Sequence, residues 1–279
     1  MFEFIKMHGI GNDYIYIDCI ANPMPDNIEQ FSRHASDRHK GIGGDGVVLI
    51  LPSDIADCRM RMFNADGSEG RMAGNVMRSV AKYLHDVGIV PKMEISIETV
   101  SGVKQVLLYA FGGVVRSARV SMGAARLAPK EIPVLLDGER VIDRRVRIAD
   151  GEYNISCVNM GNPHCVVFVD RVDDVDVERI GPMFENDPLF PERVNTEFVR
   201  VVNRNTLKMR VWERGSGETM ACGTGACAAV VAAIERGLCD RDADITVKVR
   251  GGELIVSCIG EEIYLTGETE TVYSGVGEY

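Results

Sequence analysis

Residues 69–81 read EGRMAGNVMRSVA, and residues 218–230 read ETMACGTGACAAV. The two stretches superpose at an offset of about 149 residues, which aligns Glu69 with Glu218, Gly74 with Gly223, and Ala73 with Cys222. A second pair of motifs, beginning at Gly11 and at Gly161, recurs at nearly the same offset. A period this long indicates two duplicated domains, because the repeats of solenoid proteins are only about 20–50 residues long.

The order of predicted elements indicates an α/β protein of two halves. Four apolar, β-branched runs predict strands: Gly46–Leu51, Cys165–Val169, Phe198–Val202 and Ile245–Val249. Apolar residues at helical spacing predict a helix over Asn75–Val87, which Gly88 ends, and Ala226–Arg236 is apolar on every side, as a core helix is. We therefore expect several strands around one central helix in each half.

The chain boundary between the halves is expected near residue 126. Residues 1–126, completed by residues 270–279, form the first predicted domain, and residues 127–269 form the second. The stretch Leu127–Asp150 contains Pro129 and Pro133 with alternating charges, so we interpret it as the crossing between them.

Composition narrows the class of protein. The net charge of −10 argues against a nucleic-acid partner, because no basic excess is present to neutralise phosphates. No apolar run approaches the roughly 20 residues of a membrane span, and the N-terminus does not resemble a signal peptide. The eight cysteines form no C-x-x-C pair, so we expect free thiols in a reducing cytoplasm.

The run Cys222-Gly223-Thr224-Gly225 is the strongest candidate site. It leads into a predicted helix, and a helix N-terminus offers unpaired N–H groups and a partial positive charge. We expect this environment to favour the thiolate of Cys222 and to bind a substrate carboxylate on the same N–H groups. The alternative interpretation is a structural free cysteine beside a tight turn.

Other polar residues lie in contexts typical of a binding site. Five asparagines stand in loop-like positions and offer both donors and acceptors for ammonium and carboxylate groups: Asn12, Asn64, Asn75, Asn162 and Asn195. Glu213 and Arg214 follow a predicted strand and form a pair suited to a zwitterion, and His164 is suited to tuning a thiol. Each of these residues also has an ordinary structural interpretation, as a turn residue, a solvated surface pair or a hydrogen-bonded histidine.

Two further kinds of site are disfavoured. Residues 41–46 match G-x-G-x-x-G, but a predicted helical segment, Arg33–Lys40, precedes them and a strand follows, which is the reverse of a dinucleotide-binding fold. We expect this turn to present Asp45 or backbone amides to a ligand. Metal ligation by His34, His39, Cys222 or Cys227 is not expected, because their spacings match no common metal site.

The whole chain resembles the diaminopimelate epimerases. MHGIGNDYIYID, GIGGDG, FNADGSE, MGNPHC, RVNTEFV and ERGSGETMACGTGACAAV stand in that family's order. The resemblance implies two pseudo-symmetric domains, each a strand barrel around a helix, with the substrate in a cleft between them. It implies conversion of LL-2,6-diaminopimelate to the meso isomer for lysine and peptidoglycan synthesis. It also implies a cytoplasmic homodimer that uses neither pyridoxal phosphate nor a metal.

The resemblance also assigns roles to residues. Cys222 matches one of the family's two catalytic cysteines, and His164 and Glu213 match residues that tune the thiols. The matches to substrate-binding positions are Asn12, Asn64, Gly74, Asn75, Asn162, Asn195, Glu213, Arg214, Gly223 and Thr224. The other catalytic cysteine of the family falls on Ala73, and Val76, Ser79 and Gly46 also depart from the usual pattern.

The alanine at position 73 leaves several explanations open. One is a deliberate replacement of the catalytic cysteine in an epimerase. Another is a natural one-thiol relative that acts as a different isomerase or an eliminase, or that binds diaminopimelate without turnover. In a third, water or Ser79 replaces the missing thiol. We favour the first, because the binding residues are intact while only the reactive atom is gone. We expect this chain to be impaired or inactive as an epimerase, because inversion needs an acid or base on both faces of the α-carbon. An isomerase for another amino acid and a non-enzymatic interaction scaffold are the more distant alternatives.

Overall fold

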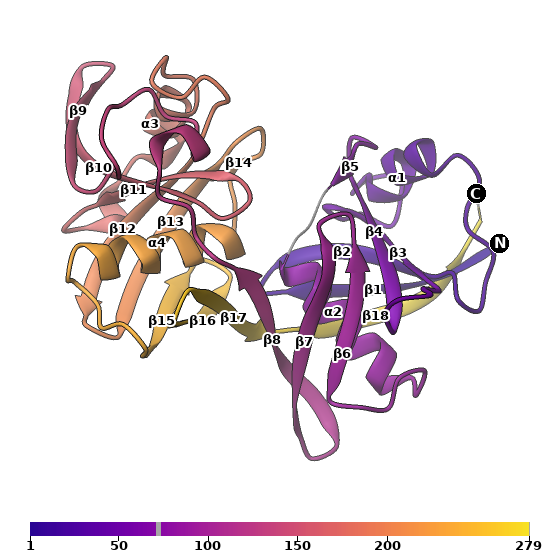
Figure 1. The fold of residues 1–279 in the computed structure, drawn as a ribbon. Helices are drawn as coiled ribbons and strands as arrows, with labels where there is room; N and C mark the ends of the chain where they lie inside the picture. The colour runs from indigo at the N-terminus through magenta and orange to yellow at the C-terminus, as the bar shows by residue number, and fades with distance from the viewer. Residues whose placement is uncertain (71–73, 279) are drawn as a thin grey trace. The chain divides into compact units, whose positions relative to one another are not determined.

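The computed structural model describes residues 1–70 and 74–278 (Figure 1). The chain divides into two compact units, which we call unit 1 (Met1–Ser121 with Thr266–Tyr279) and unit 2 (Met122–Leu265). Each unit contains strands and one central helix, and the expectation of an α/β fold is confirmed.

Unit 1 is a series of neighbouring strands that begins with the last strand of the chain. Its elements are β1 (Phe2–Gly9), β2 (Asn12–Asp18), α1 (Ile28–Ser36), β3 (Gly46–Leu51), β4 (Cys58–Asn64), β5 (Glu69–Gly70), α2 (Gly74–Asp86), β6 (Glu94–Thr99), β7 (Gly102–Phe111), β8 (Val114–Gly123) and β18 (Glu270–Gly277). The pairing runs β18, β1, β2, β3, β4, β6, β7 and β8, in which β2–β3 and β4–β6 are parallel.

Unit 2 repeats this plan. Its elements are η1 (Pro129–Glu131), β9 (Arg144–Ile148), β10 (Gly151–Asn159), β11 (Pro163–Phe168), η2 (Val172–Asp174), α3 (Val177–Glu185), β12 (Asn195–Asn203), β13 (Thr206–Glu213), β14 (Gly217–Glu218), α4 (Gly223–Glu235), β15 (Asp244–Val249) and β16 (Gly252–Ile259); β17 (Glu262–Glu268) leads back to unit 1. The pairing runs β9, β10, β11, β12, β13, β15 and β16, in which β11–β12 and β13–β15 are parallel.

The two units share the same alternation of parallel and antiparallel pairs. In each, a short helix (α1 or α3) connects the first parallel pair, and the central helix (α2 or α4) connects the second. A parallel pair needs a crossover, which a helix supplies. The duplication visible in the sequence is therefore a duplication of the whole strand–helix plan.

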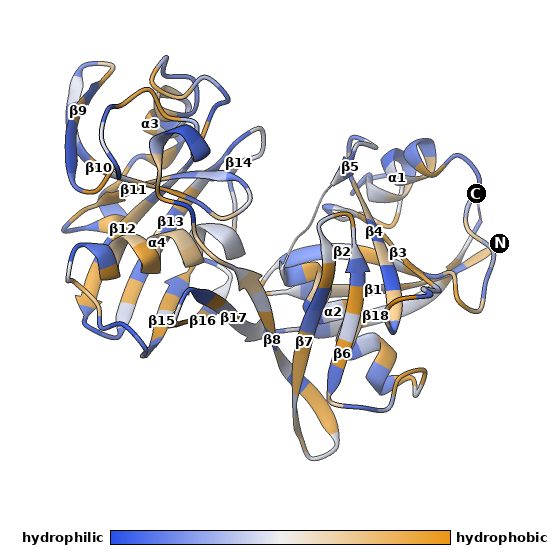
Figure 2. Cartoon of the chain, viewed as in Figure 1, coloured by the Kyte–Doolittle hydropathy of each residue, from blue (hydrophilic) through white to orange (hydrophobic). Residues whose placement is uncertain are grey.

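The central helix of unit 2 is buried on every side. All residues of α4 from Gly225 to Ala233 are buried, and the helix contacts β10, β11, β12, β13, β15 and β16. Small alanine and valine side chains allow these strands to approach it from all directions. Figure 2 colours most of this helix white to orange, as its apolar composition requires. In unit 1, α2 contacts β1, β2, β6 and β7.

The predicted elements agree with the structure except at two places. The four predicted strands lie within β3, β11, β12 and β15 or overlap them, and both central helices are present. The helical segment expected over Arg33–Lys40 is wrong in its second half, because α1 ends at Ser36 and Asp37 begins a turn. The stretch Leu127–Asp150 is no simple crossing, since four of its apolar side chains join the core of unit 2: Ile132, Val134, Val141 and Ile148.

Candidate active site

The Cys222 thiol lies at the start of α4, where the sequence predicted it. Cys222 is the N-cap residue, with extended backbone angles, and its Sγ accepts a hydrogen bond from the Gly225 N–H at 3.4 Å. The Thr224 hydroxyl lies 3.5 Å from the same sulfur. The first turn of α4 thus directs the Gly225 N–H at the thiol sulfur.

The electrostatic balance at Cys222 differs from the sequence expectation. Burial raises the pKa of the Cys222 thiol well above its ordinary value, and the neighbouring carboxylates of Glu213 and Glu197 raise it further. The hydrogen bonds from Thr224 and Gly225 act in the opposite direction. The sequence expectation counted only the helix N-terminus, whereas burial, which disfavours the charged form, acts against it and raises the pKa of the thiol overall.

Glu213 is the carboxyl group beside the thiol. It ends β13, and burial raises its pKa above the ordinary value, opposed by hydrogen bonds from Thr219 and Cys222. The Thr219 hydroxyl donates to Glu213 Oε1. A buried carboxyl with a raised pKa, in contact with a thiol, is the arrangement of a group that can exchange a proton with that thiol.

A chain of hydrogen bonds leads from a buried carboxylate to Cys222. Glu197 Oε1 lies 2.7 Å from His164 Nδ1, and both side chains are fully buried. His164 Nε2 lies 2.9 Å from Asn162 Oδ1, and Asn162 Nδ2 donates to Thr224 Oγ1 at 3.3 Å. The structure thus joins four residues from β11, β12, α4 and the loop before β11 into one polar network.

Asn195 and Arg214 lie at the same end of the strands. Asn195 Nδ2 donates to the Pro163 carbonyl at 2.8 Å, and its Oδ1 accepts the Arg214 N–H at 2.9 Å. The Arg214 guanidinium donates to the Glu192 carbonyl at 2.7 Å. Asn195 therefore fixes the backbone from which Arg214 extends.

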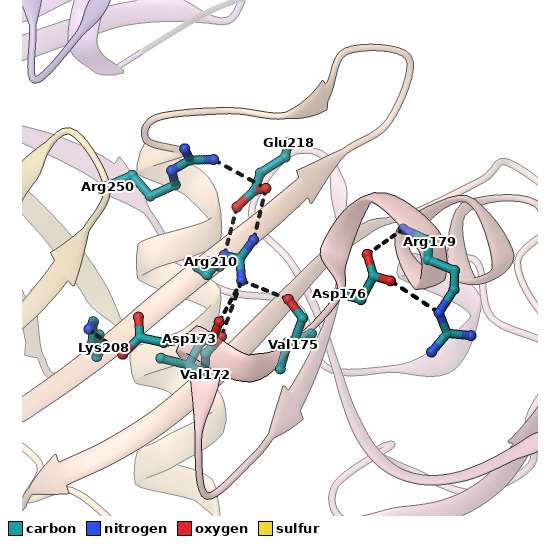
Figure 3. Close-up of polar contacts among 9 residues, drawn as sticks. All are labelled: Val172, Asp173, Val175, Asp176, Arg179, Lys208, Arg210, Glu218 and Arg250. Atoms are coloured by element: carbon teal, nitrogen blue, oxygen red, sulfur yellow. Dashed lines mark hydrogen bonds and ion pairs between the residues drawn. The ribbon is translucent and has the colours of Figure 1, made fainter.

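The strand before the Cys222 loop is held by two arginines. Arg210 forms a bidentate pair with Glu218 at 2.7 and 3.0 Å, and Arg250 reaches the same carboxylate at 3.2 Å (Figure 3). Arg210 Nη1 also donates to the carbonyls of Val175, at 2.7 Å, and Asp173, at 3.3 Å, beside η2. This clamp anchors β14 and hence the chain that leads to Cys222.

In unit 1 the predicted residues form two groups. Asn75, in the first turn of α2, accepts from Arg78 Nη2 at 2.7 Å and donates to Asn12 Oδ1 at 3.4 Å, so Asn12 and Asn75 lie together. Asn12 Nδ2 in turn donates to Asp45 Oδ2 at 2.7 Å. The Asp45 carboxylate, expected to face a ligand, thus contacts Asn12 within the chain.

Asn64 ends β4 and binds its own turn. Its Nδ2 donates to Ser68 Oγ at 3.0 Å, and no hydrogen bond among the described residues joins its side chain to Asn12 or Asn75. Gly74 is the first residue of α2, but Ala73 lies outside the described residues. The Arg61–Glu69 pair, at 2.7 and 3.0 Å, is the counterpart in unit 1 of the Arg210–Glu218 clamp.

Further observations concern metal ligands, disulfides and membrane-spanning helices. Among the parts of the chain that are described, no three metal-ligating side chains gather. All eight cysteines are free thiols, as predicted. No described helix has the length and apolar character needed to cross a bilayer.

Comparison with known proteins identifies the family. The model of the family "Diaminopimelate epimerase" matches residues 4–128 and 156–272, which include Cys222 and its neighbours. This chain belongs to the diaminopimelate epimerase family. The diaminopimelate epimerase of Methanococcus maripaludis is 48% identical over 275 residues, 98% of each chain. That of Desulfovibrio desulfuricans is 50% identical over 281 residues, 98% of this chain and 97% of the relative.

Solved structures show how widely this fold occurs. A probable proline racemase from Agrobacterium radiobacter superposes with a TM-score of 0.70 at 15% identity, covering 100% of this chain and 93% of that one. A phenazine biosynthesis protein from Bacillus anthracis superposes with a TM-score of 0.71 at 15% identity, covering 98% of each. The chain is an isomerase of the epimerase type with the fold of this wider group.

Sequence reasoning missed two features of this epimerase-family site. Glu197 was not singled out, although it stands two residues after Asn195 and so lies on the same face of β12. The ion pairs Arg61–Glu69 and Arg210–Glu218 are separated by the same offset as the duplicated motifs. Extending the alignment of the two halves beyond those motifs would therefore have indicated both pairs.

Proposed function

We propose that this chain binds diaminopimelate and exchanges its α-proton with Cys222, as one half of the LL-to-meso epimerisation. The observation that carries the proposal is the buried thiol at the start of α4 with the Glu213 carboxyl in contact. The activity would supply meso-diaminopimelate for lysine and peptidoglycan synthesis in the cytoplasm. It would use neither pyridoxal phosphate nor a metal.

The chemistry on the Cys222 face follows from the contacts. Glu213 accepts the thiol proton, and the resulting thiolate removes the α-proton of the substrate. The substrate carboxylate, on which negative charge then develops, would bind the N–H groups of Gly223 and Thr224 in the first turn of α4, because the N–H groups of a helix N-terminus have no partner within the helix. Asn162, Asn195 and Arg214 would hold the remaining charged groups of the substrate.

The resemblance aligns the family's first catalytic cysteine, which would serve the opposite face of the α-carbon, with Ala73. A methyl group holds no transferable proton, and general acid–base groups each contribute about 10²–10⁴-fold to a rate. We infer that this chain binds diaminopimelate but inverts it slowly. A substitute role for Ser79 is disfavoured, because its hydroxyl is buried and lies 2.8 Å from Thr269 Oγ1 and 3.4 Å from the Asn75 carbonyl.

Restoring the thiol tests this proposal. Ala73→Cys is expected to raise LL-to-meso conversion by about 10²-fold or more over the unmodified chain. Cys222→Ser in the Ala73→Cys background is the matched control, and it is expected to remove the gain. If Ala73→Cys binds diaminopimelate in calorimetry but gives no gain in conversion, position 73 does not carry the missing acid or base. Absence of binding in both proteins would favour another substrate.

We also propose a homodimer, and the exposed face of β7 supports it. Leu107, Tyr109 and Phe111 alternate along the strand, so they share one face, and each is exposed. Val114, the first residue of β8, is paired with Phe111 and is also exposed. Exposed apolar patches of this kind mark interaction surfaces. Light scattering on the unmodified chain and on Phe111→Glu tests it: the dimer is expected to be lost in the variant.

A further inference from the structure

Glu197 is a fully buried acidic residue that the proposed mechanism does not use. Its carboxylate is fully buried on β12, and Oε2 has no hydrogen-bond partner among the described residues, while Oε1 contacts His164. A Cβ added at Gly225 would lie 2.6 Å from this Oε1, so the carboxylate packs directly against the first turn of α4. Burying a carboxylate costs folding free energy, so a fully buried carboxylate such as that of Glu197 indicates a structural or functional role.

The hydrogen bonds beyond Glu197 have a definite direction. Asn162 Nδ2 donates to Thr224 Oγ1, so Asn162 Oδ1 is the acceptor that faces His164. An acceptor at this position requires a hydrogen on His164 Nε2. Because the Thr224 oxygen already accepts from Asn162, its own hydrogen is available for Cys222 Sγ at 3.5 Å. Every link from His164 onward therefore donates toward the sulfur.

We propose that Glu197 is a positioning residue that holds His164 with its Nε2–H directed at Asn162, and so directs the Thr224 hydroxyl to donate to Cys222. Glu197 orients the imidazole through Nδ1, and rotation of the ring would break its 2.7 Å contact. Without that contact, Asn162 can exchange its amide oxygen and nitrogen. The Thr224 hydroxyl would then donate to Asn162 rather than to the thiol. This inference rests on the proposed role of Cys222 as acid or base.

Through the hydrogen-bond chain, loss of Glu197 would weaken the Thr224 hydrogen bond to Cys222 and so raise the pKa of the thiol. The charge of Glu197 by itself predicts the opposite effect on that pKa. Among the described residues, the titratable groups that interact with Cys222 or with its neighbour Glu213 are Glu213 from β13, Glu197 from β12, and His164 from β11. The negative charge of Glu197 raises the pKa of the Cys222 thiol, so its removal should lower that pKa whatever Thr224 does. The positioning role requires in addition that the influence of Thr224 depend on Glu197. No hydrogen bond among the described residues joins Glu197 directly to Thr224, so their coupling must pass through His164 and Asn162.

A double-mutant cycle tests this dependence. The thiolate of Cys222 is titrated by ultraviolet absorbance in four proteins: the unmodified chain, Glu197→Met, Thr224→Val and the double variant, each minus its Cys222→Ser counterpart. When Glu197 is present, Thr224→Val is expected to raise the midpoint of the Cys222 titration. In the Glu197→Met background, the change that Thr224→Val causes in the acid dissociation constant of Cys222 should be at least about twofold smaller. Equal effects of Thr224→Val in both backgrounds would overturn the proposal.

Thr196→Val is the matched control for the cycle. Thr196 is the neighbour of Glu197 on β12, it is equally buried, and its side chain lies on the other face of the strand. Its substitution should leave the effect of Thr224→Val unchanged. The titration needs no turnover, so a chain without epimerase activity still decides the question.

A second measurement uses the unmodified protein and so does not depend on how the Glu197 variant folds. Nitrogen-15 spectra of histidine-labelled protein report which ring nitrogens carry hydrogen, and His164 is assigned by the signals that His164→Gln removes. The proposal predicts a protonated Nε2. An Nε2 without hydrogen would mean that the chain runs in the other direction, and the proposal would be wrong.

Discussion

The two duplicated arginine clamps are expected to differ in their contribution to stability. Arg210–Glu218 and Arg61–Glu69 have the same bidentate geometry, at 2.7 and 3.0 Å. The side chains of the first pair are 18% and 5% exposed, and those of the second 28% and 38%. The perturbations are Arg210→Met and Arg61→Met, which keep much of the apolar stem and remove the charge.

Burial sets the expected magnitudes. Removing one partner of a buried pair costs about 3–5 kcal/mol, and we expect about 3 kcal/mol for Arg210→Met, because Arg250 still contacts Glu218. An exposed pair is worth about 0.2–1 kcal/mol. Arg61 also lies 5.0 Å from the centre of the Phe63 ring, so we expect about 1 kcal/mol for Arg61→Met. The predicted difference between the two variants is therefore about 2 kcal/mol.

Urea unfolding measures this difference. Trp212 is the single tryptophan of the chain and lies in unit 2, so its fluorescence follows the unit that contains Arg210. Far-ultraviolet circular dichroism follows the whole chain, including the unit that contains Arg61. Equal losses in the free energy of unfolding for Arg210→Met and Arg61→Met would refute the argument that burial, rather than geometry, sets the value of these pairs.

Three further predictions concern unit 2. The hydrogen bond from Arg210 lowers the pKa of Glu218. The Glu218 carboxylate therefore contributes its full stabilisation above its unfolded-state pKa, and this contribution is lost as the pH falls through its folded-state pKa. Glu218→Gln should flatten the acid side of a plot of unfolding free energy against pH. Thr219→Val removes a donor from Glu213 and should raise the pKa of that carboxyl further, which carbon-13 NMR titration measures; an unchanged midpoint would contradict the role of the hydroxyl. Gly225→Ala places a methyl 2.6 Å from Glu197 Oε1 and should cost about 1–3 kcal/mol of stability; a neutral result in urea unfolding would mean that the carboxylate has room to move.

Local patterns in the sequence predicted the elements but not the long-range contacts. The apolar circumference of Ala226–Arg236 is a property of the residues themselves, and it correctly indicated a helix enclosed by strands. The Leu127–Asp150 stretch misled, because its prolines and charges outnumber the four apolar side chains that enter the core. Sparse apolar residues in irregular chain have no period to detect.

The position of Cys222 in the fold could be predicted from the sequence, but the electrostatic balance around its thiol could not. The start of α4 at Cys222 followed from the glycines and the apolar run after them. The raised pKa of the thiol depends on how deeply the sulfur is buried and on Glu197, which arrives from β12 through strand pairing. Neither burial depth nor the neighbours across a parallel pair can be read from local spacing.

The central claim is that Cys222 exchanges the α-proton alone, because position 73 holds alanine. Solvent-deuterium uptake at the α-carbon of diaminopimelate, with the configuration of the product analysed, tests this most directly. The unmodified chain is expected to introduce deuterium much faster than it inverts the α-carbon, and Cys222→Ser is expected to abolish the uptake. Uptake that survives Cys222→Ser, or inversion at a rate that Ala73→Cys does not increase, would contradict the account.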